Sequence, residues 1–193
     1  MAASPQDNYF GIFGLSPRLR IDAEALRISF LDLSRKHHPD FFANATDQEK
    51  RESLQRSSEI NNAYKALRDD QKRAEYVIEK FGSGIESNKN AVPPELLEEM
   101  FEIQEAGEEL RDARLKSDGV KLQAAEAKIA PLRKQVQAAR NSLTEKLAQQ
   151  FAQFDAAVES ASPASEAAQR ILREIRLTLD RMNYLRTVLR NLK

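Results

Sequence analysis

Residues 23–42 read AEALRISFLDLSRKHHPDFF, and this stretch decides how the first part of the chain folds. Its apolar residues recur at the spacing of one helical face, which predicts a helix over residues 23–36 packed against a core. Asp22 stands directly before it and can act as an N-cap, because its carboxylate can accept from the first free amides. The expected core-facing side chains are Leu26, Phe30 and Leu33.

The helix must end near residue 37, because Pro39 lacks an amide hydrogen and disfavours helical backbone at His38. In the tripeptide His38-Pro39-Asp40 the proline fixes the path, the histidine offers an imidazole, and Asp40 offers a carboxylate that can pair with a partner's arginine. This is typical of a docking edge, although a solvated helix that simply stops at a proline explains the pattern equally well. The basic side chains on the preceding helix are Arg27, Arg35 and Lys36.

A second helical pattern follows a polar loop over residues 39–47 and runs to about Arg68. Asn44, Thr46 or Asp47 can cap it. A shorter helix then carries residues 73–78. The side chains of the longer helix that we expect to point inward are Leu54, Ile60, Ala63 or Tyr64, and Leu67.

Composition predicts an all-α protein. The 193 residues are rich in strong helix formers, and no long Val/Ile/Thr alternation competes with them. The 30 basic and 30 acidic residues balance, so no global field attracts nucleic acid or a membrane. Cysteine is absent, and neither a signal-peptide pattern nor an apolar run of about 20 residues is present. We expect a cytoplasmic protein without nucleic-acid or membrane partners.

Phe81-Gly82-Ser83-Gly84 and the polar residues after it predict a boundary between two modules. The expected domains are residues 7–80, a linker over 81–92, and residues 93–193. Short connections between long helices predict that the last module is an antiparallel three-helix bundle. Its expected helices cover about 94–117, 119–160 and 163–192.

Two prolines mark the expected helix ends and breaks of this bundle. Pro131 lies inside the second pattern and should kink it or divide it. Ser162 and Pro163 form an N-cap and first-turn pair for the last helix.

The first bundle helix carries an apolar stripe and an apolar pair outside it. Leu97 and Phe101 lie about 80° or more from the stripe, beside Glu105 and Glu108. An apolar pair rimmed by carboxylates indicates a partner-binding patch, while a wide core face packed under the linker is the alternative. The stripe consists of Leu96, Met100, Ile103, Gly107 and Leu110.

Charge differs between the first and last bundle helices. Residues 95–112 hold eight acids and one base, whereas residues 170–193 hold seven bases and two acids. We expect the two helices to lie side by side and attract each other. A nucleic-acid face on the last helix is less favoured, because only Tyr184 interleaves its basic residues with an aromatic.

The sequence contains no pattern that predicts a catalytic site or a metal site. His37 and His38 are the only histidines, and an adjacent pair without cysteine or a spaced glutamate cannot close a zinc site. No nucleophile, base and acid arrangement is identifiable, and no phosphate loop is visible. We expect a protein that is not an enzyme and has no cofactor.

The segments YFGIFGLSP, HPD and INNAYKALRDDQKRAEY resemble a J-domain, and more narrowly the HscB family of iron–sulfur co-chaperones. The resemblance covers most of the chain and implies a J-domain helical hairpin plus a C-terminal three-helix bundle, in a roughly L-shaped arrangement. It implies that His38, Pro39 and Asp40, with the basic helix before them, stimulate ATP hydrolysis by a DnaK/HscA-type chaperone. Phe41, Glu98 and Gly107 depart from the common family pattern, which has lysine, an apolar residue and leucine there.

The resemblance also implies a client. In HscB-like proteins the acidic helix is implied to bind the iron–sulfur scaffold protein of the IscU type. The alternatives are a J-domain co-chaperone for a different client and a non-catalytic helical scaffolding protein. The positions that the resemblance carries over for scaffold binding are Leu97, Phe101, Glu102, Glu105 and Tyr184.

Overall fold

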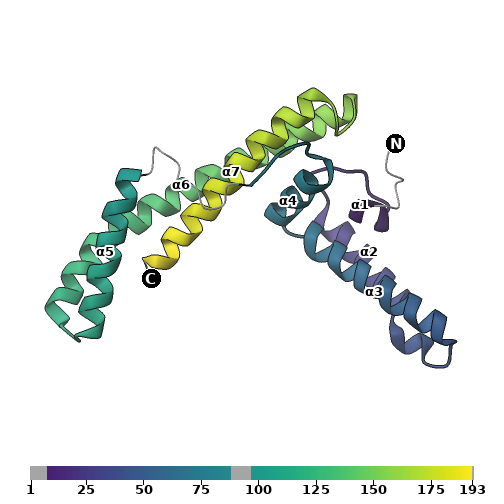
Figure 1. The fold of residues 1–193 in the computed structure, drawn as a ribbon, viewed down its shortest axis with the longest axis horizontal. Coiled ribbons are helices and arrows are strands. Elements are labelled where there is room, and N and C mark those ends of the chain that lie inside the picture. Colours follow the sequence, from purple (N-terminus) through teal and green to yellow (C-terminus); the bar gives the residue numbers. More distant parts are fainter. Residues whose placement is uncertain (1–7, 88–96, 193) are drawn as a thin grey trace. The chain divides into compact units, whose positions relative to one another are not determined.

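The computed structural model describes residues 8–87 and 97–192, and every regular element in these ranges is a helix (Figure 1). Side chains in the first turn of the helix that starts at Leu97 are described from Phe101 onward. The all-α prediction is confirmed. No helix in the described ranges has the length and apolar character needed to span a bilayer.

The N-terminal elements are α1 (Tyr9–Ile12), α2 (Ala23–Lys36), the 3-10 turn η2 (Pro39–Phe42), α3 (Asp47–Leu67) and α4 (Asp70–Phe81). The predicted bounds of α2 are confirmed, as is its cap. The Asp22 carboxylate accepts hydrogen bonds from the amides of Glu24 and Ala25 at 2.9 and 3.0 Å. Leu26 is buried, and Phe30 stacks on Tyr64 of α3 with ring centroids 4.0 Å apart.

Two predictions for α3 and the loop before it need correction. Residues 39–42 form a turn of 3-10 helix, where the sequence predicted only loop. Leu54 is 57% exposed, and the neighbouring Ser53 is buried instead. The Ser53 hydroxyl donates to the His37 carbonyl at 3.2 Å, so this face of α3 turns toward the end of α2 and Leu54 turns away. Thr46, one of three candidate caps, begins α3 in a reciprocal capping box with Glu49.

The C-terminal elements are α5 (Leu97–Leu115), α6 (Gly119–Ser160) and α7 (Glu166–Asn191). Pro131 lies within α6, which is not divided there. The predicted start of α7 at Ser162-Pro163 is wrong. The helix begins at Glu166, because the hydroxyl of Ser165 accepts the amide of Ala168 at 3.3 Å and so provides the cap.

The chain packs as two compact units. The first unit contains the residues up to 85 together with 151–173, and the second contains 86–150 and 174–193. The unit boundaries therefore fall inside α6 and α7. The domain ranges 7–80, 81–92 and 93–193 stay a prediction about modules of the sequence, and residues 88–92 of the proposed linker lie outside the described residues.

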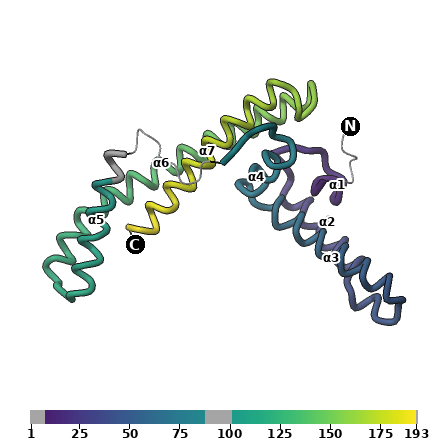
Figure 2. The backbone as a smooth tube through the Cα atoms, viewed as in Figure 1, coloured from purple at the N-terminus to yellow at the C-terminus, as the bar shows by residue number. Residues whose placement is uncertain are grey.

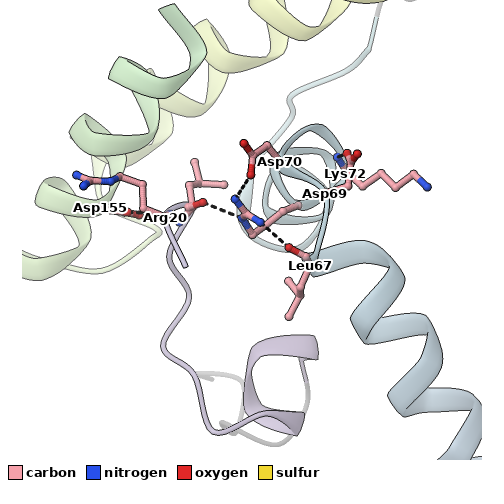
Figure 3. Close-up of polar contacts among 8 residues, drawn as sticks. Arg20, Leu67, Asp69, Asp70, Lys72 and Asp155 are labelled. Carbon is pink, nitrogen blue, oxygen red and sulfur yellow. Dashed lines mark hydrogen bonds and ion pairs between the residues drawn. The ribbon is translucent and has the colours of Figure 1, made fainter. Parts of the chain in front are cut away.

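In the first unit, the main-chain groups of Leu19 and Arg20 connect the N-terminal segment to α4 and to the end of α6, and Figure 3 shows Asp155 beside Arg20. The Asp155 carboxylate of α6 accepts the amides of Leu19 at 2.7 Å and Arg20 at 2.9 Å. The Arg73 guanidinium of α4 donates to the Leu19 carbonyl at 2.7 Å and also to the Leu67 carbonyl. Leu19 is fully buried, so its main-chain groups need these partners.

In the second unit, α5, α6 and α7 share one apolar core, and Figure 2 traces their backbones. Ile103 and Leu110 of the predicted stripe are buried there. Gly107 is also buried, and a Cβ at this position would lie 3.2 Å from the Asn191 carbonyl oxygen. The glycine therefore lets α5 approach the end of α7 closely. Leu96 lies outside the described residues, as does the side chain of Met100.

Candidate partner-binding sites

The His38-Pro39-Asp40 tripeptide forms a well-defined turn at the end of α2. His38 has extended backbone angles (φ −67°, ψ 129°), as the following proline predicts, and it caps the η2 turn. The Asp40 amide donates to Nδ1 of His38 at 3.3 Å. Pro39 occupies the first turn of η2, where its missing amide hydrogen leaves no bond unmade.

The His38 ring lies beside Asp40. Its Nδ1 atom is 3.3 Å from the Asp40 amide nitrogen and 3.5 Å from an Asp40 carboxylate oxygen. The Asp40 side chain is 87% exposed, so its carboxylate is open to a guanidinium or ammonium group from outside.

The apolar surface beside this turn was not predicted as part of a site. Phe41 is 73% exposed and meets the His38 ring edge to face at 6.4 Å. On α2, Ile28 and Leu31 are 50% and 44% exposed and share a face with Arg35. Ile28 and Leu31 lie on the side of α2 that faces away from Leu26. This helical spacing could have predicted from the sequence that they are exposed.

The basic residues of α2 differ in how they are engaged. Arg27 forms a bidentate pair with Glu24, with nitrogen–oxygen distances of 2.9 and 2.6 Å. This side-chain hydrogen bond raises the pKa of Arg27 and lowers the pKa of Glu24. Arg35 and Lys36 are exposed in the last turn and have no ion pair within the part of the chain that the structure describes. Their charge also favours the negative end of the helix dipole.

The second predicted site is only partly brought together. Phe101 is 67% exposed, as expected from its position outside the core stripe, and the side chains of Glu102 and Glu105 are exposed beside it. Tyr184 of α7 is half-buried and packs against the core of the second unit. Leu97 is the first residue of α5, and its side chain lies outside the described residues.

Glu102 also lines a groove of about 530 Å³ in the second unit. The groove lies among α5, α6 and α7, and the side chains of Leu132, Val136 and Leu143 give it an apolar floor. Arg181 and Glu102 are the charged residues of its lining. Carboxylates beside an apolar depression can orient a ligand while the apolar surface supplies affinity.

The prediction that the acidic and basic helices of the bundle lie side by side agrees with the close approach of Gly107 of α5 to Asn191 of α7. Their mutual attraction stays a prediction. Acidic and basic residues of α5 also form ion pairs with α6, with Glu109 2.7 Å from Lys128 and Arg114 3.0 Å from Glu126. Along α7, Arg186 and Arg190 line a groove shared with basic residues of α6.

Comparison with known proteins agrees with this architecture. The DnaJ domain family model matches residues 8–76, which covers α1 to α4 up to Tyr76. A curated relative, the co-chaperone protein HscB homolog of Azoarcus sp. (strain BH72), is 41% identical over 115 residues. The chain is similar to this HscB homolog over the matched residues. The match covers 58% of this chain and 64% of the relative, which is slightly less than two thirds of that protein's length.

Solved HscB structures extend the likeness over the whole chain. Chaperone HscB from Vibrio cholerae is 28% identical with a TM-score of 0.57, and the match covers 96% of this chain and 99% of that structure. Human co-chaperone protein HscB matches with a TM-score of 0.65 at 23% identity, covering 100% of this chain and 83% of that one, and it supports the fold. The J-domain plus C-terminal helical region that the sequence predicted is confirmed.

Proposed function

We propose that this protein is a co-chaperone whose J-domain stimulates ATP hydrolysis by a DnaK/HscA-type chaperone. The observation that carries the proposal is the exposed His38-Pro39-Asp40 turn at the end of a basic helix. Asp40 offers an exposed carboxylate, and Arg35 and Lys36 offer positive charge in the last turn of the preceding helix. A partner with a complementary arginine and an acidic surface would engage both groups at once.

The ATP site belongs to the chaperone in this proposal, so the protein acts by binding and not by catalysis. Two hydrogen bonds support the turn: Ser53 of α3 donates to the His37 carbonyl, and the Asp40 amide donates to Nδ1 of His38. A preformed turn loses little conformational entropy on binding, which raises affinity for a transient partner.

The test is a single-turnover ATPase assay of DnaK or HscA with and without this protein. We expect wild type to accelerate hydrolysis and both His38→Gln and Asp40→Asn to abolish most of the acceleration. His37→Gln is the matched control, because His37 is the adjacent histidine and contributes its main-chain carbonyl to the Ser53 bond. If His38→Gln and His37→Gln both stimulate like wild type, the proposed turn is not the chaperone contact.

We propose that the client is an iron–sulfur scaffold protein of the IscU type, bound through Leu97, Phe101, Glu102, Glu105 and Tyr184. An aromatic side chain that is 67% exposed and flanked by Glu102 and Glu105 supports this assignment. Binding client and chaperone on one chain raises the effective concentration of the client at the chaperone. We place this activity in the cytoplasm and in the maturation of iron–sulfur proteins.

Isothermal titration of IscU into the protein tests the client. Phe101→Ala should weaken binding about tenfold or more, as expected for an aromatic anchor that becomes buried. Leu115→Ala is the control, since Leu115 is 85% exposed on the same helix but lies outside the patch. If Phe101→Ala binds IscU as tightly as wild type, the patch around Phe101 is not the IscU-binding surface. Normal ATPase stimulation without any IscU binding would point to a different client.

A further inference from the structure

A second groove in the helical bundle is lined by positive charge and has no role in the activities discussed above. It lies between α6 and α7 within the second unit and has a volume of about 760 Å³. This size is within the range of ligand-binding sites. Five of its lining residues are cationic: Arg133, Lys134, Arg140, Arg186 and Arg190.

The cations form two facing rows. On α6, Arg133 and Arg140 are seven residues apart, which is about 10 Å along a helix, and on α7, Arg186 and Arg190 are one turn apart. The Arg133 guanidinium donates to the Leu192 carbonyl at 2.7 Å, which joins the two helices at one end of the groove. The rows therefore offer positive charge at several points along an extended path.

Among the described residues that line the groove there is no carboxylate. Glu126 pairs with one of these cations, Arg133, at 3.0 Å and also with Arg114. Lys134 and Arg190 are exposed, so their charges reach the solvent. A concave surface that gathers charge of one sign attracts ligands of the other sign more strongly than scattered charges do.

The remaining lining favours a polypeptide over a nucleic acid. Leu189 and the aliphatic stems of the arginines add apolar surface, and Gln137 and Thr187 can bond to main-chain groups. Nucleic-acid grooves combine basic residues with aromatic side chains on which bases stack, and no aromatic residue lines this groove within the described residues. Arginine forks also match carboxylates in a bidentate geometry.

We propose that the groove between α6 and α7 binds an acidic polypeptide segment of a partner protein, one that alternates carboxylates with small apolar side chains. Its carboxylates pair with the two rows of cations, and its apolar side chains lie against Leu189. The groove is distinct from the Phe101 patch on α5, because it is formed by residues of α6 and α7 alone.

The experiment uses the full chain and a fluorescein-labelled peptide with the sequence Glu-Glu-Leu-Ser repeated three times. Binding is measured by fluorescence anisotropy in 50 mM and 300 mM NaCl. Arg186→Glu with Arg190→Glu changes the groove from five positive charges to a net charge of one, and we expect affinity to fall about tenfold or more. Binding by wild type should also weaken at the higher salt concentration.

Arg170→Glu with Arg173→Glu is the matched control, since both arginines are exposed on α7 and neither lines the groove. Loss in the groove variant alone supports the proposal. Equal loss in both double variants means attraction by overall charge and overturns it, as does absence of peptide binding. Tighter binding of a single-stranded oligonucleotide than of the peptide also overturns it. If the double groove variant does not fold, Lys134→Glu provides a single substitution at an exposed lining residue. It should also lower the affinity for the peptide.

Discussion

Replacing Asp155 by alanine should loosen the first unit, because this carboxylate satisfies two main-chain donors at once. The Leu19 amide donates to it at 2.7 Å and is buried, while the Arg20 amide donates at 2.9 Å and is partly buried. A hydrogen bond to a charged group contributes about 1.5–3 kcal/mol, and a buried donor without a partner costs about 1–3 kcal/mol. The desolvation of the carboxylate offsets part of this gain. We therefore expect Asp155→Ala to reduce the opening free energy by about 3 kcal/mol.

Native-state hydrogen exchange with mass spectrometry can measure this loss in peptides that cover residues 15–21 and the ends of α3 and α4. Glu159→Ala is a suitable control, because Glu159 is also an acid of α6 that pairs with the same segment, through Arg18 at 2.8 Å. Both partners of that ion pair are about half exposed, so its removal should cost about 0.5 kcal/mol. If the two variants lose the same small amount of protection, Asp155 does not hold the segment and the reasoning is refuted.

Burial raises the pKa of Asp155 above 3.8 despite the two amide bonds that lower it, so the folded state binds its proton more tightly than the unfolded state. The pH-dependent part of the stability that Asp155 provides is therefore fully present below pH 3.8 and is lost as the pH rises through the folded pKa. In urea unfolding, Asp155→Ala should lower the free energy of unfolding more at pH 4 than at pH 7. A larger loss at pH 7 would contradict the raised pKa. Gly107→Leu should destabilise the second unit by about 2 kcal/mol in thermal unfolding, because a Cβ would already lie 3.2 Å from the Asn191 carbonyl. Gly119→Ala, with open space around its Cβ, is the control and should be neutral or stabilising. Thr46→Ala should cost about 1 kcal/mol by removing the cap of α3, measured by urea unfolding, and an unchanged midpoint would mean that the capping box is not stabilising.

Local signals in the sequence were sufficient for several elements. The position of Asp22 and the proline at residue 39 predicted both ends of α2, because capping and proline geometry act within a few residues. The exposure of Phe101 followed from its angle around α5. The N-cap of α7 was predicted wrongly, because two serines close together can both act as a cap. Ser165, not Ser162, caps α7.

The tertiary partners could not be predicted in this way. Leu54 and Ser53 are adjacent on α3, and only the docking of α3 onto the His37 carbonyl decides which of them is buried. Asp155 lies far from Leu19 in the sequence, and nothing in its surroundings along α6 marks it as a main-chain acceptor. The basic groove likewise depends on the register between α6 and α7, which helical periodicity does not determine.

Both main-chain groups of Leu19 are hydrogen-bonded, the amide to Asp155 and the carbonyl to Arg73. This limits how the J-domain can be transferred to another protein. A fragment cut after α4 would keep Arg73 on the carbonyl side of Leu19 but would lose Asp155 on the amide side. It would also lose Phe151, whose ring lies 6.0 Å from the Arg73 guanidinium. The smallest transplantable module is therefore discontinuous in the sequence. A chimera that borrows this J-domain should bring residues 151–173 with it, or supply a substitute acid for the Leu19 amide.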